Sequence, residues 1–433
     1  MKKHIASILF LFLLSTFQLI AQSHSVKRLG IEQGLSNNYV VSITQDKQGF
    51  LWFATEEGLN KFDGTRFTTY YKNDLTQDNQ GITGNELNRV YADTKHPIIW
   101  IATQRDGLNA YNYNEQTFTA YQHNPENPHS LITNDVTDIA PSTQHDDGLW
   151  ISTYYRGIEY LDITSGQFTH YNKSTVPSLP CDQTWTVLDG GDGNLYIGHV
   201  GSGFSIFSPK DKSVKNFRNE AGNPMSLPGN DVFCIIKDAN GNIWLGTNNG
   251  LALYDAANEN FITFKNNKND KYATLCSRIL SIRQLKDNRL WIASELNGIA
   301  ILNLKQSMFL SPEEISLEYI QEGADNRSLS NASARCIFQD SFDNIWIGTW
   351  GGGINFISSK PPLFTTLSYS PIPNNENSLN NKVASSLCMD RQGRVWIGTD
   401  GGGINVFEGE KRIAIYKKYS FEFYISLFAG FKR

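Results

Sequence analysis

The side chains with the clearest binding chemistry in this 433-residue sequence are aromatic rings and guanidinium groups near a recurring apolar phrase. Aromatic rings can stack on the apolar face of a sugar, and charged groups can donate to or accept from its hydroxyls. The same residues could instead be solvated turn residues, so they are candidates only. The candidate ligand-binding residues are Arg105, Tyr154, Tyr155, Arg156, Trp185 and Trp350.

The elements that would position these residues come from an eightfold repeat. Each copy has an apolar residue, Trp or Tyr, a second apolar residue, a small residue and usually Thr, as in LWFAT at 51–55. The aromatic anchors are Trp52, Trp100, Trp150, Tyr196, Trp244, Trp291, Trp346 and Trp396. Their successive spacings are 48, 50, 46, 48, 47, 55 and 50 residues. Short β-branched and aromatic runs at this period predict four-stranded propeller blades.

The first repeat divides into four predicted strands. They span residues 40–44, 51–55, 58–62 and 66–71. Asp46 begins the first hairpin, where its carboxylate can accept hydrogen bonds from turn amides and Gly49 can adopt a positive φ. The anchor tryptophans fall in phase on the second strand of each repeat. We expect their rings to pack between neighbouring blades.

One additional strand precedes the first blade. Residues 25–29 resemble the end of an outer strand, and residues 34–38 resemble the loop that leads into a blade. A ring leaves no open edge if this strand completes the last blade. We therefore predict an all-β fold: a seven-bladed β-propeller of four-stranded antiparallel blades, closed by pairing of residues 25–29 with the blade around Trp346.

Strand direction assigns the candidates to one face of the ring. Because successive strands alternate in direction, the second turn of each blade and the connections between blades share a face. The connections at 73–87 and 123–134 are long and differ from each other, and variable loops on a rigid scaffold commonly bind ligands. All six candidates except Trp185 fall in second turns.

The C-terminal part departs from the repeat pattern. An eighth repeat has no successor, and after Phe407 the aromatic residues expected in a fourth strand are replaced by KRIAIYKKY at 411–419. One blade alone cannot bury both of its faces, so we interpret the chain as truncated. The predicted parts are a signal peptide at 1–21, the propeller at 22–360, an orphan first blade of a second propeller at 361–407 and an aberrant tail at 408–433.

The N-terminus predicts export. Lys2, Lys3 and His4 precede an apolar stretch at 5–21, which is typical of a signal peptide cleaved after Ala21. A membrane anchor is the alternative, because the stretch approaches the length of a span. We expect a periplasmic protein. Cleavage would change the formal charge from −5 to −7, since it removes two lysines, and this sign disfavours nucleic acid as a partner. The apolar residues 421–431 are too few to span a membrane.

Cysteine and histidine positions indicate neither a disulfide framework nor a metal site. The five cysteines are an odd number. Cys234 and Cys336 each lie ten residues before an anchor, where a small core residue is expected. The eight histidines have no ligand spacing. We expect no metal and no cofactor.

Two segments resemble the two-component regulator propeller repeat. They are QDKQGFLWFATEEGLNKFDG at 45–64 and IWIGTWGGGINF at 345–356. The resemblance extends from residue 24 to about residue 407. Proteins with this repeat form the sensor region of hybrid two-component systems in Bacteroides-type bacteria.

The resemblance implies a periplasmic sensor anchored in the inner membrane. Its full plan is two seven-bladed propellers, an immunoglobulin-like module, a membrane helix, a histidine kinase, a receiver and a helix-turn-helix domain. It implies an oligosaccharide ligand and a homodimer in the full-length protein. The sequence departs from this plan after Phe407, where no kinase motif, ATP-binding glycine-rich box or receiver occurs. We therefore expect a ligand-binding region that is not an enzyme.

Two alternatives remain open from the residues. One is a non-catalytic scaffold that dimerises or binds proteins through the propeller. The other is a propeller glycosidase or lyase, which would suit the same compartment. Asp46 and Gly49 are three residues apart, whereas the sialidase Asp box places Gly two residues after Asp. Adjacent Glu56 and Glu57 are weak evidence for acid–base chemistry, because neighbouring turn residues usually point apart.

Overall fold

A computed structural model describes residues 25–72, 81–264, 273–304, 317–360, 366–370 and 375–417. The predicted signal peptide and the apolar residues 421–431 lie outside these ranges. Nearly all described residues belong to strands and turns, with short 3-10 helices at Ile31–Gln33 and Thr274–Cys276. No helix in the described ranges has the length and apolar character that crossing a membrane requires.

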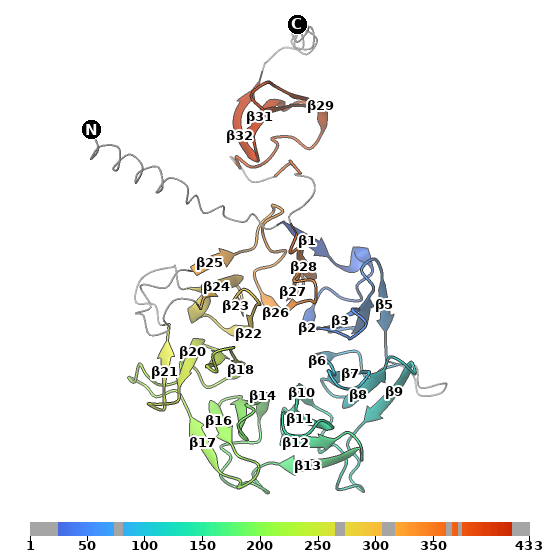
Figure 1. The fold of residues 1–433 in the computed structure, drawn as a ribbon, viewed down its shortest axis with the longest axis vertical. Coiled ribbons are helices and arrows are strands. Elements are labelled where there is room, and N and C mark those ends of the chain that lie inside the picture. The colour runs from blue at the N-terminus through green and yellow to red at the C-terminus, as the bar shows by residue number, and fades with distance from the viewer. Residues whose placement is uncertain are drawn as a thin grey trace, which may run out of the picture.

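The described residues form eight antiparallel sheets of four strands each. Seven sheets follow one another around a ring, and the eighth lies apart from it (Figure 1). In chain order the ring contains β1 (Val26–Leu29), β2 (Val40–Gln45), β3 (Leu51–Thr55), β4 (Gly58–Phe62), β5 (Phe67–Tyr70), β6 (Leu87–Ala92), β7 (Ile98–Thr103), β8 (Leu108–Asn112), β9 (Thr117–Tyr121), β10 (Val136–Pro141), β11 (Gly148–Thr153), β12 (Gly157–Asp162), β13 (Gln167–Tyr171), β14 (Thr184–Asp189), β15 (Leu195–His199), β16 (Phe204–Phe207), β17 (Val214–Phe217), β18 (Val232–Lys237), β19 (Ile243–Thr247), β20 (Gly250–Asp255), β21 (Asn260–Thr263), β22 (Ile279–Gln284), β23 (Arg289–Ser294), β24 (Ile299–Asn303), β25 (Leu317–Ile320), β26 (Ala334–Gln339), β27 (Ile345–Thr349) and β28 (Ile354–Ile357).

The first strand closes the ring as the sequence predicted. β1 pairs antiparallel with β28, with Val26 opposite Ile357 and Leu29 opposite Ile354. Its sheet has the order β1-β28-β27-β26, so the strand at the start of the chain supplies the outer edge of the last blade. The ring thus has no unfinished sheet between its first and last blades.

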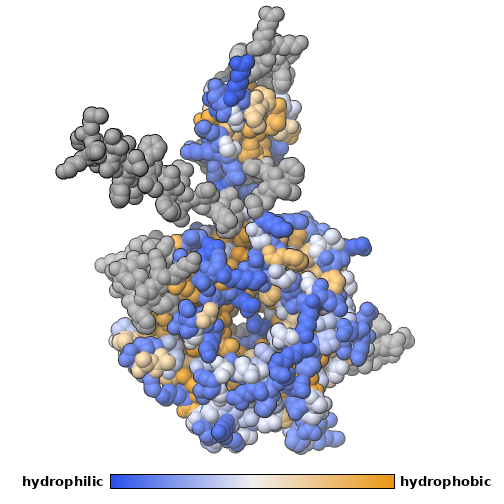
Figure 2. Space-filling view, in the orientation of Figure 1, coloured by the Kyte–Doolittle hydropathy of each residue, from blue (hydrophilic) through white to orange (hydrophobic). Residues whose placement is uncertain are grey.

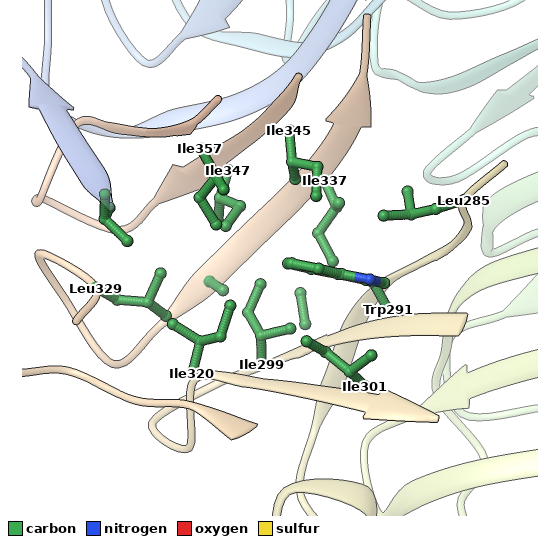
Figure 3. Packing of buried hydrophobic residues seen from close by; sticks show 13 residues of the cluster. Leu285, Trp291, Ile299, Ile301, Ile320, Leu329, Ile337, Ile345, Ile347 and Ile357 are labelled. Atoms are coloured by element: carbon green, nitrogen blue, oxygen red, sulfur yellow. The ribbon is translucent and has the colours of Figure 1, made fainter. Parts of the chain in front are cut away.

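The anchor rings of the seven blades in the ring pack between neighbouring blades, which confirms the role expected for them. Trp291 on β23 is fully buried in a cluster that also contains Ile337 and Ile345 of the next blade. Figure 3 shows its ring lying among isoleucines from both blades. Burying an indole between preformed sheets removes a large apolar surface from water. Each blade therefore depends on its neighbour for its core.

In four blades of the ring, a buried aspartate of the first hairpin accepts a hydrogen bond from the indole N–H of the anchor tryptophan. Asp46 Oδ2 accepts a hydrogen bond from Trp52 Nε1 at 2.8 Å, and Asp340 Oδ2 accepts one from Trp346 Nε1 at 2.8 Å. The same carboxylate accepts amides of its own hairpin, as with Phe50 N at 2.9 Å. These bonds from the hairpin amides to the aspartate are the turn hydrogen bonds that the sequence predicted.

The blade around Trp291 lacks this aspartate. Leu285 occupies the position six residues before the anchor, and Trp291 Nε1 is buried without a hydrogen-bond partner among the described residues. Leu285 is itself buried against Trp291. In this blade, apolar packing against Leu285 therefore takes the place of the hydrogen bond between aspartate and indole.

The eighth sheet differs from our expectation at its C-terminal edge. It contains β29 (Ala384–Met389), β30 (Val395–Thr399), β31 (Gly403–Glu408) and β32 (Lys411–Tyr416). β32 pairs with β31, so the sheet continues past Phe407, where we expected the blade to end.

The fourth strand forms because Tyr416 supplies the aromatic residue that we had expected the sequence after Phe407 to lack. Its ring stacks on Trp396 with centroids 5.8 Å apart, as Tyr70 stacks on Trp52 at 5.9 Å in the first blade. The segment that we interpreted as the start of an aberrant tail thus completes the sheet.

The inner strand of the eighth sheet has no neighbouring blade among the described residues. Leu387 and Met389 on β29 are each 69% exposed, whereas the inner strands of the ring are largely buried. Apolar residues stand out on this sheet in the space-filling view (Figure 2). Arg327 and Glu410 form an ion pair between the ring and the eighth sheet.

Candidate functional site

In six of the eight sheets, a bond between the Thr of the recurring phrase and a following Gly closes the second turn. Thr349 Oγ1 donates to the carbonyl of Gly353 at 2.8 Å, and five other blades repeat this bond. Gly353 has a φ of +71°, and a Cβ at this position would collide with the Leu29 carbonyl of the neighbouring strand. Glycine is required here both by the backbone conformation and by the close approach of the strand.

The connections between blades are held by a buried side chain in the third strand. Asn60 Oδ1 accepts the backbone N–H of Ser36 at 3.0 Å, and Asn355 Oδ1 accepts that of Ser330 at 2.9 Å. Both asparagines are fully buried. These bonds fix the variable loops on the same face as the second turns, and so give the candidate site a rigid base.

Each inner strand begins with a β-bulge, at the end of the strand that follows the connection between blades. The register of the first pair of strands in every blade skips one residue, for instance between Ala334 and Cys336. Bulges commonly redirect a side chain near a site. The bulged residues of the ring are Val41, Asn88, Thr137, Trp185, Phe233, Leu280 and Arg335.

Three of the candidate residues lie in one row of ring contacts. The Tyr154 ring packs edge-on against Tyr155 with centroids 4.4 Å apart and against Trp185 at 6.2 Å. Trp185 in turn packs edge-on against Phe233 at 5.8 Å. The row continues to Arg278, whose guanidinium lies 4.2 Å from the Phe233 centroid. It therefore joins four successive blades across the face.

Trp350 lies in a second group, where the last blade meets the first. Its ring packs edge-on against Tyr39 at 5.2 Å, and the Arg335 guanidinium lies over it at 4.5 Å from the centroid. An isolated β-bridge joins Tyr39 and Trp350. Trp350 remains 40% exposed, so one part of its ring is available to a ligand.

Charged residues connect the two groups. Arg278 forms an ion pair with Glu295 at 3.4 Å. Burial, reinforced by the nearby Arg278 guanidinium, lowers the pKa of Arg335, whereas Glu56 and Glu295 oppose this effect. The two groups contain rings and guanidinium groups of successive blades, and the charges of Arg278 and Arg335 are near enough to interact. We call the residues Tyr39, Tyr154, Tyr155, Trp185, Phe233, Arg278, Arg335 and Trp350 the aromatic–arginine belt.

The remaining two candidates are not part of the belt. Arg105 and Arg156 are exposed in the second turns of their blades. Among the described residues, neither side chain has a ring contact, a hydrogen bond or an ion pair with the belt. Both carry a guanidinium on the expected face, but no contact with the belt holds either side chain in place among the described residues.

Four belt residues escaped the sequence analysis: Tyr39, Phe233, Arg278 and Arg335. A signal for two of them was available, because Phe233 and Arg335 lie eleven residues before their anchors, as does the candidate Trp185. Aligning the repeats at this position would have found them. The bulge that turns these side chains toward the centre could not be read from the pattern of apolar residues.

The two core cysteines have the packing role expected for them. Cys336 is buried, and burial raises the pKa of the Cys234 and Cys336 thiols to about 12. The thiols face Gly246 and Gly348 so closely that a Cβ at either glycine would collide with sulfur. They are therefore protonated at neutral pH and contribute to the inner wall of the ring.

One blade replaces the loop-holding asparagine with an ionisable pair. Glu159 is fully buried and accepts the N–H of Ile132 at 3.0 Å, while its other oxygen lies 3.3 Å from His170 Nδ1. Burial raises the pKa of Glu159, and the nearby Glu159 carboxylate raises the pKa of His170. Stability contributed by His170 is therefore complete below its unfolded pKa of about 6.5 and is lost as pH rises through its folded-state pKa.

We expect His170→Gln to cost about 1 kcal/mol at pH 6 and less at pH 9, because the ion pair with Glu159 exists only while the histidine is protonated. Thermal unfolding of the wild type and the variant at both pH values measures this difference. His129→Gln, at an exposed position, is the matched control. A cost that is equal at pH 6 and pH 9 would contradict the assignment.

Four segments of the chain match the two component regulator propeller family: residues 34–57, 226–249, 328–351 and 378–401. Each covers a connection or its end and the first two strands of a blade, in the ring and in the eighth sheet alike. Two-component regulator propeller repeats therefore occur both in the ring and in the eighth sheet.

The most informative structural relative is the extracellular domain of the putative hybrid two component system BT3049 from B. thetaiotaomicron. It is 64% identical, with a TM-score of 0.75, over 91% of this chain. This chain spans only 49% of that domain. A histidine kinase P4 from Formosa agariphila is 42% identical over 66 residues, which are 15% of this chain and 5% of that protein.

More distant structures share the fold alone. The extracellular domain of the putative one component system BT4673 from B. thetaiotaomicron has 20% identity and a TM-score of 0.59, and covers 92% of this chain and 48% of its own length. A streptogramin B lyase has 12% identity and a TM-score of 0.55, with 77% of this chain and 97% of its own length covered. At these identities the lyase provides no argument for an enzymatic role.

Proposed function

We propose that this chain is the ligand-sensing region of an extracellular, periplasmic two-component sensor, and that its ligand is an oligosaccharide. The observation that supports this proposal is the aromatic–arginine belt, which joins several blades on the face formed by second turns and connections. Partly exposed rings can stack on sugar faces, and guanidinium groups can donate to sugar hydroxyls. The repeats and the similarity to an extracellular domain add support from homology.

Within the proposed sensor, the chain has a binding role and no catalytic one. We propose that the sheet β29–β32 is the first blade of a second propeller, since its inner strand exposes Leu387 and Met389 where a neighbouring blade would cover them. The relative's extracellular domain is about twice as long as the matched region, which accommodates such a propeller. Anchoring in the inner membrane and homodimerisation belong to this proposal for the longer protein.

A thermal-shift screen of the purified chain against plant, host and microbial oligosaccharides tests the proposal. A ligand at 100 times its dissociation constant adds about 2.7 kcal/mol of stability. We expect a shift that Tyr154→Ala or Trp350→Ala reduces by more than half, because each removes a ring from the belt. Phe342→Ala is the matched control, since Phe342 is 71% exposed in a first-turn hairpin outside the belt.

The outcomes distinguish this function from its alternative. A thermal shift that persists in both belt variants would mean that the sugar binds outside the belt. If the wild type and all variants fold but no oligosaccharide stabilises them, a non-catalytic scaffold that binds protein through the ring becomes the better proposal. Cross-linking of the purified chain then measures whether copies associate.

A further inference from the structure

Two arginines at the centre of the ring lack an acidic partner. Arg335 is the bulged residue of β26, and Arg283 lies on the neighbouring inner strand, β22. Among the described residues neither guanidinium has a hydrogen bond or an ion pair; each only faces a ring, Trp350 at 4.5 Å and Phe338 at 5.8 Å from the centroid. A guanidinium carries five N–H donors, and the Arg283 side chain is exposed whereas Arg335 is half-buried.

The nearby carboxylates pair with other arginines. Asp138 is bound to Arg89 at 3.1 Å, and Glu295 to Arg278 at 3.4 Å. Glu56 faces Arg335 from beyond ion-pair distance and is the remaining acid of this group. Burial, together with the Arg89 charge, lowers the pKa of Arg283. The centre of the ring therefore keeps two positive groups without a bonded counter-charge.

The geometry of Arg335 suits recognition of a planar or tetrahedral anion. A guanidinium stacked on an indole keeps its N–H edge free for bidentate bonds, and stacking restricts its rotamers beforehand. Trp350, beside it, is 40% exposed. The space-filling view shows a hollow at the centre of the ring (Figure 2), and the ribbon shows the inner strands around that centre (Figure 1). A charged sugar can thus meet a ring and a guanidinium in one place.

We propose that the ligand of this face is an acidic oligosaccharide, whose carboxylate or sulfate group binds Arg335 while a sugar ring lies against Trp350. Arg283, three residues past the bulged Leu280 of β22, adds a second positive charge that attracts the anion at longer range. This inference rests on the proposed sensing function and specifies its ligand class. The shared chemistry is an anionic group on a sugar, and the experiment separates carboxylate from sulfate.

Calorimetric titration of the full chain with matched pairs of probes tests the inference. The first pair is an oligogalacturonate and its methyl ester; the second is a sulfated galactan tetrasaccharide and its desulfated form. We expect the acidic member of one pair to bind at least about tenfold more tightly than its neutral counterpart. Arg335→Gln should weaken binding about 10- to 100-fold and remove the discrimination. Arg66→Gln, at an exposed hairpin position, should change neither.

The result that overturns the inference is binding of the neutral sugars as tightly as the acidic ones, unchanged by Arg335→Gln; the sensing function would then stand with a neutral ligand. If no sugar of either charge binds, the sensing proposal fails instead. Inorganic sulfate then tests the anion site alone. Because sulfate stabilises folded proteins generally, the quantity compared is the thermal shift of the wild type minus that of Arg335→Gln. No difference would overturn the anion site as well.

Discussion

Replacing Leu29 with aspartate is expected to open the ring, with a loss of at least about 4 kcal/mol in the free energy of unfolding. β1 is the one strand that ties the start of the chain to its last blade, through its pairing with β28. Leu29 is buried in the cluster shared by the last and first blades, while Val26 is buried in the cluster shared with the preceding blade. An aspartate in the first cluster would be an unpaired buried charge.

The consequence would extend beyond one strand. Arg28 Nη2 donates to the carbonyls of Ser328 at 3.2 Å and Leu329 at 3.3 Å, so β1 also holds the loop that leads into β26. Losing β1 would expose the edge of β28, and exposed edges promote aggregation. Thermal unfolding and limited proteolysis measure the effect.

The matched control for Leu29→Asp is Lys27→Asp on the same strand, whose side chain is exposed. It introduces the same charge without entering a core, so its effect is expected to stay within about 0.5 kcal/mol. Equal unfolding midpoints for the two variants would show that β1 does not close the ring in solution.

The ring could be predicted from sequence because period, turn chemistry and strand alternation all indicated the same structure. The strands at 51–55 and 58–62 were placed at their observed bounds, and the closing strand was paired with the correct blade. Repeats make this possible, since each residue is judged against its equivalents in other blades. The fourth strand of the eighth sheet was missed because Tyr416 follows residues whose composition differs from the other outer strands.

The candidate site was predictable only in part, for a physical reason. Tyr154, Tyr155 and Trp350 lie in turns that follow directly from the Thr–Gly pattern, so their face could be deduced. Phe233 and Arg335 lie inside a strand, where simple alternation would direct a side chain toward a neighbouring blade. The bulge changes that direction, and a bulge depends on backbone register, which one sequence does not display.

Replacing Asp340 with alanine is expected to destabilise the ring by about 3 kcal/mol. Asp340 is buried, and its carboxylate accepts hydrogen bonds from Trp346 Nε1 at 2.8 Å and from the amides of Phe342 and Asn344 at 2.9 Å. Alanine would leave the indole N–H and the hairpin amides without their acceptor. One substitution would therefore remove the acceptor that the hairpin amides and the anchor ring share.

The matched control is Asp343→Asn in the same hairpin. Asp343 is exposed and pairs with Lys286 at 2.5 Å across the surface, and such pairs contribute at most about 1 kcal/mol. Asparagine also tolerates the φ of +65° at this position. Urea unfolding followed by tryptophan fluorescence compares the two variants with the wild type.

The Trp291 blade shows that apolar packing can replace the hydrogen bond between aspartate and indole when leucine fills the space. Alanine is too small to fill it, so a loss below 1 kcal/mol for Asp340→Ala would mean that the aspartate serves the hairpin alone.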